Sequence, residues 1–126
     1  MSTLYENEKV TVYADPRGFI EWVARENGGI TIEEVKAVNR LLAARGLTSG
    51  RALVNRENRY VHPDDYMIYD LSEVEGVRTE KVAYYAPATR DQVFSHVTAM
   101  TTLRNVSTKV FDNRDKAIAW LIANDE

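Results

Sequence analysis

The feature that most constrains this 126-residue chain is a regular alternation of short apolar segments with longer amphipathic ones. Strands are expected at residues 51–55, 81–86 and 107–111, and their segments LVN, VAYYA and KVF are short and largely apolar, as is typical of strands that are buried on both faces of a sheet. The stretches between them are long enough for helices, and such alternation favours a mostly parallel sheet that is covered by helices. The sequence therefore predicts an α/β fold.

A turn signal near the N-terminus predicts an antiparallel hairpin ahead of this alternating pattern. Residues 9–25 hold two segments of strand-forming residues, and the sequence DPRG at 15–18 separates them. The hairpin would supply an antiparallel edge of the sheet. Only the first few residues and residues 124–126 suggest disorder.

The first helix has clear sequence signals at both of its ends. Thr31 and Glu34 match a capping box, in which each side chain accepts a hydrogen bond from the other residue's backbone N–H. Gly46 readily adopts the left-handed conformation with which many helices end. The apolar residues at helical spacing between these signals are Ile32, Val35, Val38, Leu41 and Leu42. A helix is therefore expected between Thr31 and Gly46.

Three further helices are expected in the rest of the chain. One begins near Pro63 and runs through Leu71, and another covers residues 89–103. The last helix follows a cap at Asp112 or Asn113. Its buried side would hold Ala117, Ile118, Leu121 and Ile122, with Trp120 at its edge. The sequence therefore predicts about four helices beside a sheet of about five strands.

The whole chain, residues 1–126, is expected to form one domain. A chain of this length buries roughly two-thirds of the surface that its unfolded form exposes. The side chains predicted to be mostly buried are Val12, Ile20, Val35, Val38, Leu42, Leu53, Val54, Val82, Val97, Phe111, Ile118 and Leu121.

Composition and charge exclude several classes of protein. The formal net charge of −3 disfavours nucleic-acid binding, because phosphate contacts require a basic face. The absence of cysteine excludes disulfides and thiolate zinc sites. No apolar run approaches the roughly 20 residues that span a bilayer, and the N-terminus does not resemble a signal peptide. We expect a cytoplasmic protein without a membrane span or a cofactor.

Two segments near the C-terminus, together with the order of the elements, resemble a known family. They are VFDN at 110–113 and AIAWL at 117–121, and a third similar segment is LVNRENRY at 53–60. The pattern resembles the small bacterial STAS-like proteins, which are relatives of the anti-sigma-factor antagonists. The resemblance covers nearly the whole chain and implies a single STAS-like domain.

The loop that follows the central strand differs from the family pattern. In the anti-sigma-factor antagonists a serine of this loop is phosphorylated, which changes how a partner kinase docks. The corresponding residues 55–65 contain neither serine nor threonine. We therefore expect no phosphorylation switch at this loop.

The same loop holds the candidate binding residues, Arg56, Arg59, Tyr60 and His62. Ligands of open α/β sheets tend to bind beyond the carboxyl ends of the strands, where this loop would lie. Arginine suits carboxylate or phosphate groups, and residues 55–62 carry two arginines against one glutamate. The alternative is structural: Arg56 would pair with a nearby acid and Tyr60 would pack against a helix.

No catalytic or metal-binding pattern emerges from the sequence. The segment HPDD at 62–65 is explained equally well by the first turn of a helix, where aspartate is favoured. We therefore predict a non-enzymatic module that binds another protein or a second copy of itself. The alternative is a carrier of a small apolar or anionic ligand, because the family's fold resembles the lipid-binding CRAL-TRIO domain. A carrier needs a cavity of several hundred Å³, and a chain this short leaves little room for one.

Overall fold

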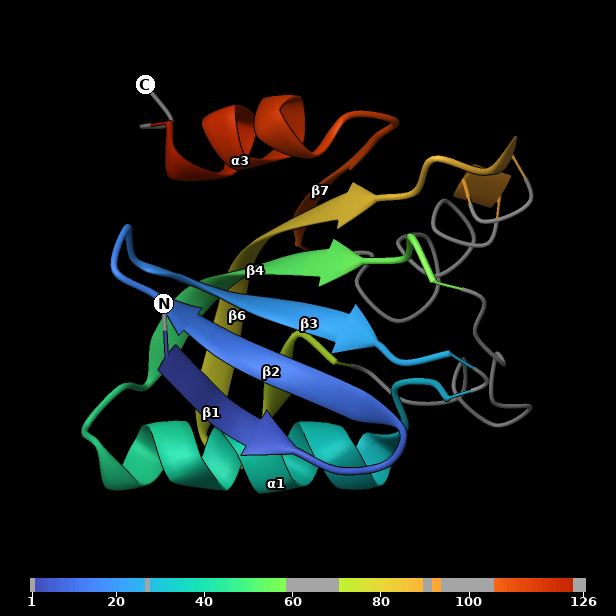
Figure 1. The fold of residues 1–126 in the computed structure, drawn as a ribbon. Helices are drawn as coiled ribbons and strands as arrows, with labels where there is room; N and C mark the ends of the chain where they lie inside the picture. The colour runs from blue at the N-terminus through green and yellow to red at the C-terminus, as the bar shows by residue number, and fades with distance from the viewer. Residues whose placement is uncertain (1, 27, 59–70, 90–91, 94–105, 124–126) are drawn as a thin grey trace.

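The computed structural model describes residues 2–26, 28–58, 71–89, 92–93 and 106–123. These residues form a seven-stranded sheet with a helix on each side (Figure 1). The elements are β1 (Ser2–Glu6), β2 (Val10–Asp15), β3 (Phe19–Ala24), α1 (Ile32–Ala44), β4 (Ser49–Asn55), β5 (Glu73–Val74), β6 (Val77–Tyr85), β7 (Ser107–Phe111) and α3 (Arg114–Ile122).

The sheet is mixed, which confirms the α/β class. β1, β2 and β3 pair antiparallel, whereas β3, β4, β6 and β7 pair parallel. β5 pairs antiparallel with the first two residues of β6. Within the described sheet, parallel and antiparallel pairings are therefore equally numerous, and the expectation of a mostly parallel sheet was wrong.

The predicted count of about five strands was too low. Residues 2–6, expected to be disordered, form β1, which pairs with β2 and packs Leu4 and Tyr5 against the core. β6 begins at Val77 rather than at residue 81, and β5 precedes it. Glu75 and Gly76, both with positive φ, form the tight turn between them. The two additional strands, β1 and β5, are short, so neither contains enough residues for a clear strand pattern in the sequence. Each is stabilised by pairing with its neighbouring strand.

The two helices of the described part begin where the sequence predicted. The backbone N–H of Thr31 donates to Oε2 of Glu34 at 3.2 Å, as the capping box requires. Gly46, at φ 78°, ends the turn that follows α1. At α3 the cap is Asn113, whose Oδ1 accepts from the backbone N–H of Lys116 at 3.0 Å, and Asp112 does not have this role. The helices predicted at 63–71 and 89–103 lie mostly outside the described residues.

The core has two parts because α1 and α3 cover opposite faces of the sheet (Figure 1). Consecutive strand residues point to opposite faces, and this places Tyr84 on the α1 side and Tyr85 on the α3 side. On the α3 side, the rings of Phe111 and Trp120 pack with their centroids 5.8 Å apart. The final strand and helix are therefore joined by apolar contact.

Most of the predicted core residues are buried, with some corrections. Ile20 and Phe111 are only half-buried, and Val97 lies outside the described residues. Ile122 was expected on the buried side of α3 but is 43% exposed, because it comes at the helix end beyond Leu121. Leu41 lies within α1 and is 39% exposed, because it is at the margin of the buried side of this helix.

In the described part of the chain, no helix is long and apolar enough to cross a membrane.

Candidate functional site

Of the four predicted binding residues, the structure describes Arg56. It comes directly after β4, at the carboxyl end of the strand, where ligands of α/β sheets tend to bind. Arg59, Tyr60 and His62 lie outside the described residues. Among the residues that are described, no three His, Cys, Asp or Glu side chains gather in a way that could hold a metal ion.

Arg56 is buried rather than exposed. Its residue is 3% accessible, and its guanidinium carbon lies 5.0 Å from the centre of the Tyr84 ring. Its backbone N–H donates to the carbonyl oxygen of Tyr85 at 2.8 Å. Arg56 therefore attaches the start of the loop to β6.

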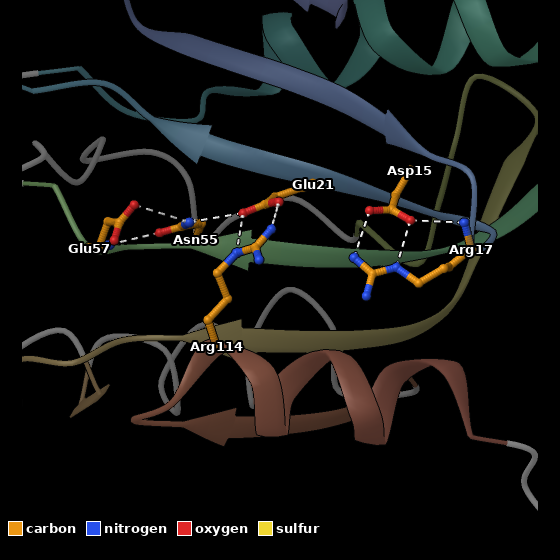
Figure 2. Close-up of polar contacts among 6 residues, drawn as sticks. All are labelled: Asp15, Arg17, Glu21, Asn55, Glu57 and Arg114. Atoms are coloured by element: carbon orange, nitrogen blue, oxygen red, sulfur yellow. Dashed lines mark hydrogen bonds and ion pairs between the residues drawn. The ribbon is translucent and has the colours of Figure 1, made fainter. Parts of the chain in front are cut away.

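A buried acid, Glu21 of β3, joins three elements at this edge of the sheet (Figure 2). Its Oε2 accepts from Nδ2 of Asn55 at 2.9 Å and from Nε of Arg114 at 3.1 Å. Its Oε1 accepts from Nη2 of Arg114, the first residue of α3. Both carboxylate oxygens are thus bonded, and β3, β4 and α3 are held together.

Asn55 extends this network into the loop after β4 (Figure 2). Its Nδ2 also lies 3.5 Å from Oε1 of Glu57, while its Oδ1 accepts from the backbone N–H of Glu57 at 3.0 Å. Nδ2 of Asn58 then donates to the carbonyl oxygen of Ala24, at the end of β3, at 3.1 Å. Residues 55–58 are therefore fixed by hydrogen bonds to the sheet.

The charges of the network compensate one another. The carboxylate of Glu21 raises the pKa of Arg114 above its ordinary value, although partial burial acts in the opposite direction. A buried carboxylate bonded on both oxygens to a guanidinium and an amide is suited to fixing structure rather than to transferring protons. This role of Glu21 was not predicted from the sequence. The available signal was a single acid within the otherwise apolar strand segment FIEWVA.

The opposite end of α3 is held by two basic side chains of the sheet. Nη1 of Arg51 donates to the carbonyl oxygens of Leu121 and Ala123, at 2.6 and 3.0 Å. Nζ of Lys81, a residue only 2% exposed, donates to the carbonyl oxygen of Trp120 at 2.6 Å and lies 4.3 Å from the centre of its ring. Cations at this position suit the negative end of the helix dipole.

A second ion pair stabilises the turn between β2 and β3 (Figure 2). Nε and Nη2 of Arg17 each donate to the Asp15 carboxylate at 2.9 Å, and the Arg17 backbone N–H adds a third bond at 2.8 Å. These bonds lower the pKa of Asp15 to about 2. Gly18 completes the turn at φ 95°, a conformation that favours glycine.

A pocket of about 280 Å³ lies between α1 and the sheet. Its lining is mostly apolar and includes Trp22, Val35, Leu42, Val54 and Val82. From the length of the chain, little room was expected for such a space. The volume is instead close to the lower limit of ordinary ligand pockets, about 300 Å³.

Comparison with known proteins identifies the fold alone. No family model and no curated protein matches the chain. Among solved structures, the chain is similar to an uncharacterized protein of the DUF3478 family from Shewanella loihica PV-4, which has a SpoIIAA-like fold. The TM-score is 0.57 at 17% identity, over 89% of this chain and 91% of that one. The likeness to STAS-like proteins is confirmed as a likeness of fold.

Proposed function

We propose that this chain is a non-enzymatic interaction module of the STAS-like type, which binds another protein at the edge where β4 ends. The observation that carries the proposal is the network of Glu21, Asn55 and Arg114, which fixes residues 55–58 at this edge. A surface that is ordered before binding loses less conformational entropy when a partner docks. The resemblance to the anti-sigma-factor antagonists, whose regulatory serine lies in the corresponding loop, supports the same edge.

The charge of the loop indicates what kind of partner it suits. Arg56 is buried against Tyr84 and is therefore not placed to contact a partner directly. Among residues 55–62, we propose that the later residues of the loop make the direct contacts with the partner. Arg59 and His62 then supply the donors for an acidic segment of the partner. Such contacts act mainly on the association rate and on its dependence on salt.

Binding at this edge is proposed to occur without phosphorylation of the loop. Residues 55–65 contain no hydroxyl side chain of serine or threonine that could accept a phosphate. The interaction would therefore be set by the concentration of the partner or by a modification elsewhere. A binding role is also favoured over catalysis because both carboxylate oxygens of Glu21, the buried acid of this edge, are bonded to the guanidinium of Arg114.

The proposal is tested by capturing partners from a lysate of the source organism with immobilised protein. Wild type is compared with Arg59→Ala, and Arg40→Ala serves as the control of equal charge change. Arg40 lies on α1 and pairs with Glu75, away from the β4 edge. We expect a specific protein that is captured by wild type and by Arg40→Ala, and that is lost or becomes strongly salt-sensitive with Arg59→Ala. Equal capture by all three would refute this binding surface.

A further inference from the structure

The pocket beneath α1 opens at the edge of the sheet opposite to the proposed partner surface. Its exposed lining residues are Gly18, Arg45, Leu47, Ser49 and Arg78. They belong to the β2–β3 turn, to the connection between α1 and β4, and to the starts of β4 and β6. The loop at 55–62 follows the other end of β4. The pocket is therefore a separate site.

The interior of the pocket exists because β4 contributes small residues beneath α1. Gly50 and Ala52 both line the space. A Cβ atom built on Gly50 would meet no atom within 4 Å, so open space begins directly at the backbone. Larger apolar side chains, Trp22 and Val82 from the sheet and Leu42 from α1, form the walls. Such walls accommodate the apolar part of a ligand.

The volume limits the size of that body. At about 280 Å³ the pocket is roughly twice an engineered cavity of about 150 Å³ that holds benzene. It therefore has room for an apolar group of roughly ten carbon atoms, by the same comparison. This excludes a complete two-chain phospholipid from the interior.

The rim of the pocket is basic. Arg45 and Arg78 line it and are exposed, and their guanidinium groups make no hydrogen bond or ion pair to other described side chains. The acid at the rim, Asp15, is already bonded three times to Arg17. The side chain of Arg51 is directed to the C-terminal carbonyls of α3. Arg45, with Arg78, is thus placed to receive an anionic group.

We propose that this pocket binds a small amphipathic anion, with an apolar body of about ten carbons inside and a carboxylate at the rim beside Arg45. Leu47, 51% exposed at the rim, covers the part of the chain next to the carboxylate. The inference goes beyond the interaction module, because it concerns another site and another class of ligand.

The experiment measures binding of decanoate, 1-decanol and acetate by the fluorescence of Trp22, which lines the pocket. The chain has two tryptophans, so the measurement uses a Trp120→Phe background in which Trp22 alone reports. We expect saturable binding of decanoate, weaker binding of decanol and none of acetate. Far-UV circular dichroism verifies that the protein stays folded at each ligand concentration.

Two pairs of variants locate the ligand. Gly50→Leu fills the pocket and is expected to lower the affinity for decanoate at least tenfold. Gly50→Ala adds a side chain too small to fill the pocket, so it should change this affinity little. Ala52→Leu repeats this test at a second position if Gly50→Leu does not fold. Arg45→Ala is expected to lower the affinity for decanoate two- to fivefold, the effect of losing an exposed ion pair. It should leave the affinity for decanol unchanged. Arg40→Ala, on α1 but outside the pocket lining, should change the binding of neither ligand.

Three results would overturn the inference. They are the absence of saturable decanoate binding, binding that both filling variants leave intact, and equal affinity for decanoate and decanol with no effect of Arg45→Ala.

Discussion

Replacing Arg114 by alanine leaves the carboxylate of Glu21 buried without its cationic partner. The Glu21 side chain is 3% exposed, and the Arg114 side chain is 34% exposed. After the substitution, Glu21 keeps the single hydrogen bond from Asn55 at 2.9 Å. The unfolding free energy should fall, because a buried charge loses most of its compensation.

The size of this loss of unfolding free energy depends on how far the ion pair of Glu21 and Arg114 is buried. Removing one partner of a fully buried pair costs about 3–5 kcal/mol, whereas an exposed pair contributes less than about 1 kcal/mol. Solvent reaches Arg114 from one side, so we expect Arg114→Ala to cost about 2–3 kcal/mol. In urea, with a slope of roughly 1–3 kcal/mol per molar, the midpoint should fall by about 0.7–3 M.

The measurement is equilibrium unfolding in urea of the wild type, both single variants and the double variant. Glu21→Gln removes the buried charge, so in the Arg114→Ala background it should restore part of the lost stability. Arg40→Ala, which breaks the exposed pair with Glu75, is the control and should cost less than about 1 kcal/mol. A loss below about 0.5 kcal/mol for Arg114→Ala, or a further loss when Glu21→Gln is added, would refute the reasoning.

Three further predictions concern stability. Leu121→Ala, at a residue with 0% exposure, should lower the unfolding free energy by about 2–5 kcal/mol in urea unfolding, and a loss below half a kcal/mol would contradict the docking of α3. Asn113→Ala should cost about 1 kcal/mol by removing the helix cap, whereas Asn113→Asp, which keeps an acceptor, should cost little. The pKa of Asp15 is lowered from 3.8 to about 2 by Arg17, so its contribution is present above pH 4 and is lost as the pH falls toward 2. Acid titration of thermal unfolding should therefore show wild type losing stability relative to Asp15→Asn in that window, and parallel curves would contradict the pairing.

Local signals explain which parts of the fold the sequence predicted. The ends of α1 depend on Thr31, Glu34 and Gly46, residues whose effect is confined to one helical turn. β1 and β5 were missed because each is stabilised by pairing with a neighbouring strand, which a single sequence does not display. Whether a strand forms at β1 and β5 therefore depends on tertiary contacts.

The candidate sites depend even more than the strands on tertiary contacts that local sequence signals do not reveal. Glu21 and Arg114 are 93 positions apart in the chain, and only the parallel arrangement of β3 and β4 beneath α3 brings them together. The pocket depends on the absence of side-chain volume at Gly50 and Ala52, and small residues near the start of a strand carry no distinctive pattern. Such features follow from the assembled sheet and could not be derived from spacing.

The two helices differ in how they are attached, and this difference bears on function. α3 is bonded to the sheet by charged side chains at both ends, by Glu21 through Arg114 at its start and by Arg51 and Lys81 at its end. α1 has a capped start, apolar contacts and polar contacts from Asn39 to Val74 and from Arg40 to Glu75, with a pocket beneath it. The proposed ligand would therefore contact α1, whereas the proposed partner surface at the end of β4 is held by the bond between Glu21 and Arg114 of α3. The two proposed sites thus use different ends of β4, the ligand pocket its start and the partner surface its end.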